Sequence, residues 1–146
     1  MAQNPRVPGS ILSTQFLGKE GGSQRLYANI DKVLPGGLSC KYHCHSLQEE
    51  FFLILSGSGQ LRTNSGTVPV KAGDFFCKPA GQGIAHQFIN DSDEVLEILD
   101  VGTCDPQDII EYPDDGIVYK KAEELVLRNG LPVSDWTSDP NTDPLT

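Results

Sequence analysis

Apolar residues occur along this chain in short runs, and glycine, proline or asparagine separates most of these runs. The runs cover residues 11–16, 25–33, 38–45, 50–55, 60–63, 67–70, 75–78, 86–89 and 95–101. Segments of this length, bounded by turn-forming residues, are typical of β-strands. The pattern therefore predicts eight or nine short strands in a sandwich or a closed barrel, an all-β fold.

A helical pattern appears only late in the chain. Residues 120–129 read KKAEELVLRN and are followed by Gly130, a usual helix terminator, so they predict a short helix. Residues 131–146 are rich in Asp, Pro, Thr and Ser and predict a C-terminal tail. We find no internal repeat, and 146 residues is a common length for one domain, so we expect residues 1–146 to form a single domain.

The charge of the chain excludes two classes of partner. The sequence has 11 Lys+Arg against 20 Asp+Glu, a formal net charge of −9. A chain this acidic repels nucleic-acid phosphates and anionic lipid headgroups, because binding to either depends on Lys and Arg. We therefore expect no nucleic acid and no membrane among its partners.

The cysteines and the N-terminal residues bear on the compartment. No stretch approaches the roughly 18–20 apolar residues of a membrane span, and residues 1–9 lack the apolar core of a secretory signal. We therefore expect a cytoplasmic protein. In that reducing compartment the four cysteines, Cys40, Cys44, Cys77 and Cys104, are expected to be free thiols.

All three histidines lie between residues 43 and 86, close enough in the chain to share a metal ion with one carboxylate. On a strand, His43 and His45 point to the same face, with Cα atoms roughly 6.6–7 Å apart. A turn over residues 46–48 would return Glu50 to that face, and His86 follows a loop rich in Gly and Pro. Such ligands suit divalent Fe, Mn, Co, Ni, Cu or Zn. The alternative is a chance grouping of exposed polar residues.

Two motifs, in order, include these four residues. The first has the spacing Gly-x5-His-x-His-x4-Glu-x6-Gly and comprises Gly37, His43, His45, Glu50 and Gly57. The second comprises Gly73, Pro79, Gly81, His86 and Asn90, with four residues between Gly81 and His86 where two are usual. With both motifs, the chain resembles the cupin superfamily over about residues 26–103.

The resemblance implies a fold and a metal site. The implied fold is a double-stranded β-helix, a jelly-roll barrel, with its core at about residues 26–103 and a C-terminal extension at 104–146 that includes the short helix and the tail. The implied metal ligands are His43, His45, Glu50 and His86. The chain looks most similar to small bacterial cupins that share a segment like Glu111–Gly116, some of which are labelled sugar-phosphate isomerases.

Strand parity adds candidates around the metal. Lys41 shares the face of His43 and His45 and is a candidate catalytic cation, unless it lies at the barrel mouth and reaches solvent. Parity also sorts the neighbouring residues into three groups: Phe52, Ile54, Phe75, Cys77 and Phe88 inside the barrel; Cys40 and Cys44 facing away from the metal; Phe51, Leu53 and Leu55 on the outer face. An apolar outer face indicates an interface, so we expect a homodimer.

The sequence supports two functional hypotheses. The first is a metalloenzyme that acts on a small polar organic molecule as a dioxygenase, isomerase, decarboxylase or lyase. The second is a metal-containing module that binds or senses a small ligand without turnover. A phosphorylated sugar would need several cations in the pocket, and the candidates are Lys41, Arg62 and Lys78.

Overall fold

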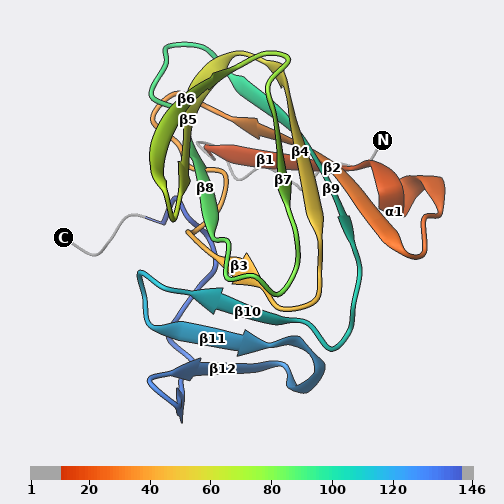
Figure 1. The fold of residues 1–146 in the computed structure, drawn as a ribbon, viewed down its shortest axis with the longest axis vertical. Coiled ribbons are helices and arrows are strands. Elements are labelled where there is room, and N and C mark those ends of the chain that lie inside the picture. Colours follow the sequence, from red (N-terminus) through yellow and green to blue (C-terminus); the bar gives the residue numbers. More distant parts are fainter. Residues whose placement is uncertain (1–10, 143–146) are drawn as a thin grey trace.

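The computed structural model describes residues 11–142, and nearly all its regular elements are β-strands (Figure 1). The elements of the barrel half are β1 (Leu12–Phe16), α1 (Leu17–Gly21), β2 (Leu26–Val33), β3 (Cys44–His45), β4 (Glu50–Ser56), β5 (Ser58–Thr63), β6 (Gly66–Lys71), β7 (Phe75–Lys78), β8 (His86–Ile89) and β9 (Leu96–Thr103). They are followed by β10 (Ile109–Tyr112), β11 (Ile117–Lys120), the 3₁₀ turn η1 (Lys121–Glu123), β12 (Leu125–Arg128) and β13 (Leu131–Pro132). The all-β prediction is confirmed.

The strands form three antiparallel sheets. The largest barrel sheet has the order β1-β2-β9-β4-β7, and a second has the order β6-β5-β8. A third sheet, β13-β12-β11-β10-β3, joins the C-terminal strands to β3 and lies below the barrel in Figure 1. The extension therefore meets the barrel at the strand that contains His45.

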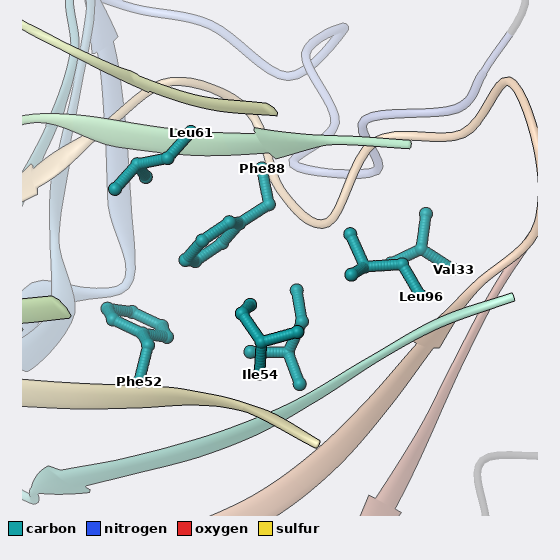
Figure 2. Close-up of a cluster of buried hydrophobic side chains, with 7 residues drawn as sticks. Val33, Phe52, Ile54, Leu61, Phe88 and Leu96 are labelled. Atoms are coloured by element: carbon teal, nitrogen blue, oxygen red, sulfur yellow. The ribbon is translucent and has the colours of Figure 1, made fainter. Parts of the chain in front are cut away.

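The core lies between the two barrel sheets, where alternate residues of each strand turn inward (Figure 2). The buried cluster consists of Val33, Phe52, Ile54, Leu61, Phe88, Leu96 and Ile98, from β2, β4, β5, β8 and β9. Side chains alternate along a strand, so every second residue of these strands lies on the core side. Phe52, Ile54 and Phe88 are inside, as parity predicts.

The register of the barrel sheet also places three acidic residues on this inward face. Glu50 starts β4 opposite Gly102, and Phe52, two residues on, lies opposite Asp100. Asp31 of β2 lies opposite Ile98. Carboxyl groups thus extend the apolar face of the sheet toward the end of the barrel where β3 begins.

Gly57 shows why the first motif ends in glycine. The residue has φ +83°, and a Cβ atom there would lie 2.3 Å from the carbonyl oxygen of Val95. Glycine avoids both the strain of positive φ and this overlap. The chain can therefore pass directly from β4 into β5.

The predicted helix at residues 120–129 is wrong. The chain forms strand β11 up to Lys120, a single 3₁₀ turn, and strand β12 from Leu125. Glu124 takes a left-handed conformation, φ 49°, which ends the turn after three residues. Pairing of β12 with β11 outweighs the helix propensity of the Lys, Ala and Glu residues.

The predicted tail is partly ordered against the domain. Strand β13 pairs with β12, Trp136 packs against Tyr112 at a ring distance of 4.5 Å, and Asn141 exchanges two hydrogen bonds with the backbone of Leu38. Residues 143–146 of the tail lie outside the described residues. Within residues 11–142 there is no helix with the length and hydropathy to cross a membrane.

Candidate metal centre

His43 and His45 each use Nδ1 in a hydrogen bond, which leaves Nε2 of both rings for a further partner. His43 Nδ1 donates to the carbonyl oxygen of Lys41 at 2.6 Å, and His45 Nδ1 donates to Asp108 Oδ2 at 2.6 Å. In a neutral imidazole the other nitrogen, Nε2, then has a free lone pair. Burial, reinforced by the charge of Lys78, lowers the pKa of His43 to about 3, so this ring is neutral at pH 7.

Glu50 completes this group of possible ligands. Its Oε2 accepts a hydrogen bond from the Tyr27 hydroxyl at 2.5 Å, while Oε1 is buried 3.0 Å from His45 Nε2 and forms no hydrogen bond of good geometry. Burial alone would raise the pKa of Glu50, but His45 and Lys78 outweigh it and hold the pKa well below its usual range. Ligand atoms of His43, His45 and Glu50 lie within 4.8 Å of one another.

His86 lies beside this group but has a different partner. Its ring is 5.2 Å from that of His43, and it forms a second group of possible ligands with His43 and Cys40, again within 4.8 Å. Its Nδ1 is 2.8 Å from Nζ of Lys78. An ammonium group has only donors, so Nδ1 accepts and Nε2 has the ring hydrogen while Lys78 is charged.

Lys78 is the buried cation of the centre. Its side chain is 1% exposed, and Nζ lies 3.0 Å from the His43 carbonyl oxygen, 3.1 Å from Glu50 Oε1 and 2.8 Å from His86 Nδ1. The contacts with the His43 carbonyl oxygen and His86 Nδ1 are hydrogen bonds, and the contact with Glu50 is an ion pair. The sequence named Lys78 only as a possible cation in the pocket, and its place behind the ligands was not foreseen.

The side chain of Lys41 contacts the C-terminal extension and is absent from the described groups of possible ligands and from the adjoining cavity wall. Its Nζ is 3.4 Å from Asp115 and lies 4.9 Å from the centre of the Trp136 ring. The segment from Leu38 to His43 forms only isolated bridges and no regular strand, so alternation fails there. Arg62 is also elsewhere, paired with Asp114 at 2.6 Å.

The same irregular segment turns Cys40 toward the centre rather than away from it. Cys40 Sγ lies 3.7 Å from His86 Nε2, and burial raises the pKa of its thiol to about 12. Cys44 packs with Tyr42 and Ala85, as expected of a buried thiol. All four cysteines are free in the structure.

Two residues that were predicted inside the barrel are outside. Phe75 is 70% exposed and Cys77 is also exposed. In β7 the pairing Glu50 with Lys78 and Phe52 with Phe76 turns the even-numbered residues inward. The prediction assigned the wrong parity because β7 is short and has an apolar residue at three successive positions.

Asp108, which sequence reasoning missed, orients His45. The residue is fully buried, and its Oδ1 accepts hydrogen bonds from the backbone amides of Leu47 and Gln48. Burial would raise the pKa of Asp108, but the His45 hydrogen bond and these amides lower it. No pattern in residues 104–108 indicates this role, since the contact depends on how the chain returns after β9.

Replacing Asp108 with Asn is expected to weaken metal binding by about 10–100-fold. Asn keeps the size of the side chain but can turn its amide toward His45 Nδ1, which favours the wrong tautomer. A competition titration with a chelating dye measures the affinity. Asp105→Asn, on the same connection, is the control. Equal affinities for Asp108→Asn and the native chain would contradict the role assigned to Asp108.

A small cavity adjoins the centre inside the barrel. It has a volume of about 80 Å³, and its wall includes His43, Glu50, His86, Asp31 and Asp100. Burial raises the pKa of Asp31 to about 6, and burial with the charges of Glu50 and Asp31 raises that of Asp100 well above its usual range. The sequence contains a signal for both residues: Asp31 is two residues before Val33 and Asp100 is two residues after Ile98, so each shares the inward face of its strand.

Asp31→Asn is expected to stabilise the protein at pH 7–8 by about 3 kcal/mol, because the pKa shift of about 2 units corresponds to that free energy. The folded pKa lies above the unfolded value of 3.8, so stability falls as the pH rises from about 4 to 6 and the penalty is complete above that window. Urea unfolding of both chains between pH 4 and 8 tests this. A stability difference that does not change across the window would contradict it.

The geometry fits a divalent metal at His43, His45 and Glu50, where two lone pairs and one carboxylate oxygen without a hydrogen bond meet. Residues 29–102 match the family model for the cupin domain. The chain belongs to the cupin family. The jelly-roll barrel and the resemblance stated from the two motifs are thereby confirmed.

Named relatives support the same fold. The chain is similar to an oxalate-binding protein of Thermotoga maritima, with 34% identity over 95 residues, 64% of this chain and 75% of that protein. The structure of a sugar phosphate isomerase from Silicibacter pomeroyi has a TM-score of 0.81 and 31% identity, covering 86% of this chain and 82% of the other. The structure of a putative sugar phosphate isomerase from Acidithiobacillus ferrooxidans has a TM-score of 0.72 and 28% identity, covering 95% of this chain and 83% of the other. The latter two extend the likeness beyond the barrel.

Proposed function

We propose that this cupin holds a divalent transition metal through His43, His45, Glu50 and His86 and acts on a small polar organic molecule. The observation that supports this most directly is the convergence of His43, His45 and Glu50 within 4.8 Å. The expected ions are Fe, Mn, Co, Ni, Cu and Zn, since imidazole and carboxylate suit all of them. When bound, such an ion would act as a Lewis acid or activate oxygen.

The residues of the chain would prepare that chemistry. Lys41 carbonyl and Asp108 hold the two imidazoles in the tautomer that leaves Nε2 free. Tyr27 fixes one oxygen of Glu50. For His86 to bind through Nε2, the Lys78–His86 pair would release one proton to solvent: Nε2 would lose its hydrogen, and the proton between Nζ and Nδ1 would move to Nδ1. Phe52 and Phe88 line the cavity and exclude water, which strengthens electrostatic interactions there.

We propose four reaction types: dioxygenation, isomerisation, decarboxylation or a lyase reaction. The isomerase relative from Silicibacter pomeroyi supports turnover. The oxalate-binding relative, together with the small volume of the cavity, favours a second candidate, a metal-containing module that binds a ligand without converting it. In both cases the partner is a small molecule.

Elemental analysis tests the metal centre. Protein loaded anaerobically with each of the six ions is expected to retain about one equivalent after gel filtration. His43→Ala, which removes a residue common to both groups of ligands, is expected to retain almost none. Asp93→Asn, an exposed surface change, is the control. If the native protein retained none of the six ions after loading, both candidate functions would be contradicted.

Three broader proposals accompany this function. We propose one domain over residues 1–146, because Asp108, from the connection to the C-terminal sheet, supports a histidine of the barrel. We propose a homodimer through the outer face of β4 and its neighbours, where Phe51 and Leu55 are exposed. We also propose a cytoplasmic location, on the sequence arguments alone.

A further inference from the structure

Two acidic side chains occupy positions inside the barrel where the strand pattern calls for apolar ones. Asp31 is two residues before Val33 on β2, and Asp100 is two residues after Ile98 on β9, so all four share the inward face of the sheet. Both acids line the cavity of about 80 Å³ that also reaches the metal centre. Polar groups at such positions cost free energy unless a partner accepts or donates a hydrogen bond.

The protein supplies only part of that partnership. Thr14 Oγ1 donates to Asp31 Oδ1 at 2.6 Å. Asp100 lies beside Tyr27 and Glu50, but its buried Oδ1 atom forms no hydrogen bond of good geometry. None of the described residues that line the cavity is a lysine or an arginine. Lys78 does not line the cavity, and its Nζ already forms hydrogen bonds with the His43 carbonyl oxygen and His86 Nδ1 and an ion pair with Glu50. Asp100 Oδ1 is therefore a buried acceptor at the cavity that lacks a donor.

We propose that the cavity binds a small uncharged compound with adjacent hydroxyl groups, whose hydroxyls donate to Asp31 and Asp100. The inference rests on the proposed function in one respect, namely that the other end of the compound faces the metal ligands. A volume of about 80 Å³ exceeds the roughly 10–15 Å³ that a single water needs on the same measure. A compound of a few heavy atoms therefore fits.

An anionic ligand does not fit this wall. Burial raises the pKa of Asp31 only to about 6, so at pH 7.5 Asp31 is a carboxylate. The distal oxygens of an oxalate ion, or a phosphate group, would face this charge with no cation beside it, and like charges repel strongly away from water. The ligand class thus differs from the ligand in the name of the oxalate-binding relative and from a sugar phosphate.

Titrations with glycerol, glycerol 3-phosphate and oxalate, followed by ¹H–¹⁵N NMR at pH 7.5, test the proposal. The protein is measured both metal-free and loaded with Zn(II), a diamagnetic probe ion, and its zinc content is determined separately. Glycerol is expected to shift the amide resonances of β2 and β9 until they saturate. Its dissociation constant from this titration is expected to be at least ten-fold lower than that of either anion. Asp31→Asn and Asp100→Asn are expected to lower this preference about ten-fold each. Asp93→Asn, the same charge change on the surface, is expected to leave it unchanged.

The outcomes separate this inference from the metal proposal. Zinc bound at one equivalent with no glycerol binding, or with an anion binding as tightly as glycerol, overturns the inference and leaves the metal centre standing. Glycerol binding without zinc retention supports the inference and contradicts the metal centre. A variant with unchanged preference also contradicts the inference. If Asp100→Asn does not fold, as judged by circular dichroism, the preference for glycerol over the two anions is still compared between Asp31→Asn and the native protein, and that comparison tests the inference.

Discussion

Lys78→Met is expected to destabilise the metal-free protein by about 3–5 kcal/mol. Methionine fills a similar volume but removes all three donors that Nζ offers. The substitution leaves the Glu50 carboxylate buried without its nearest cation and leaves His86 Nδ1 without a donor. The His43 carbonyl oxygen loses one of its two hydrogen bonds and keeps the one from the His86 backbone amide. The loss is large because a buried ion that has lost its partner keeps its full desolvation penalty. Urea unfolding in the presence of a chelator measures it.

Two further variants test whether the loss of stability comes from the buried contacts of Lys78. Lys71→Met changes a lysine whose side chain is 79% exposed, and we expect a difference of less than about 0.5 kcal/mol. The double variant Glu50→Gln/Lys78→Met removes both charges and is expected to be more stable than Lys78→Met alone, since a neutral pair leaves no buried charge. If Lys78→Met matched Lys71→Met, the contacts of Lys78 would not contribute to stability.

Spacing within regular strands predicted much of this fold, because alternation is reliable where a strand is paired along its length. The inward positions of Phe52, Ile54 and Phe88 follow from it. The same rule failed for Lys41 and Cys40, since their segment has only isolated bridges and its backbone does not alternate. Irregular backbone next to the ligands is therefore where a sequence pattern says least about direction.

Contacts between distant segments were beyond the reach of sequence patterns. Asp108 meets His45 from 63 residues away, and Tyr27 meets Glu50 from 23 away. Neither contact is encoded in a local period, because each depends on the closure of the barrel. The C-terminal helix was predicted from local propensity, which pairing of β12 with β11 overrides. The four candidate ligands were found only because the motifs give their spacing, and their role as ligands remains a prediction.

Phe88→Ala is expected to cost about 3–5 kcal/mol of unfolding free energy, whereas Phe75→Ala is expected to cost less than about 1 kcal/mol. Phe88 is 1% exposed, and its ring lies 5.4 Å from that of Phe52 across the core (Figure 2). Removing it leaves a cavity that the two facing sheets cannot close. Phe75 is 70% exposed, and its ring stacks on that of Phe51 at a centroid distance of 6.2 Å.

Urea unfolding of the two variants at two protein concentrations measures the difference. The concentration series separates any contribution of Phe75 to a dimer interface, since only an interface makes stability depend on concentration. A concentration-independent loss for Phe75→Ala as large as that for Phe88→Ala would show that β7 turns its odd-numbered residues inward. Glu50 would then not lie beside Lys78 in the register of the sheet, and the arrangement behind the candidate metal centre would be wrong.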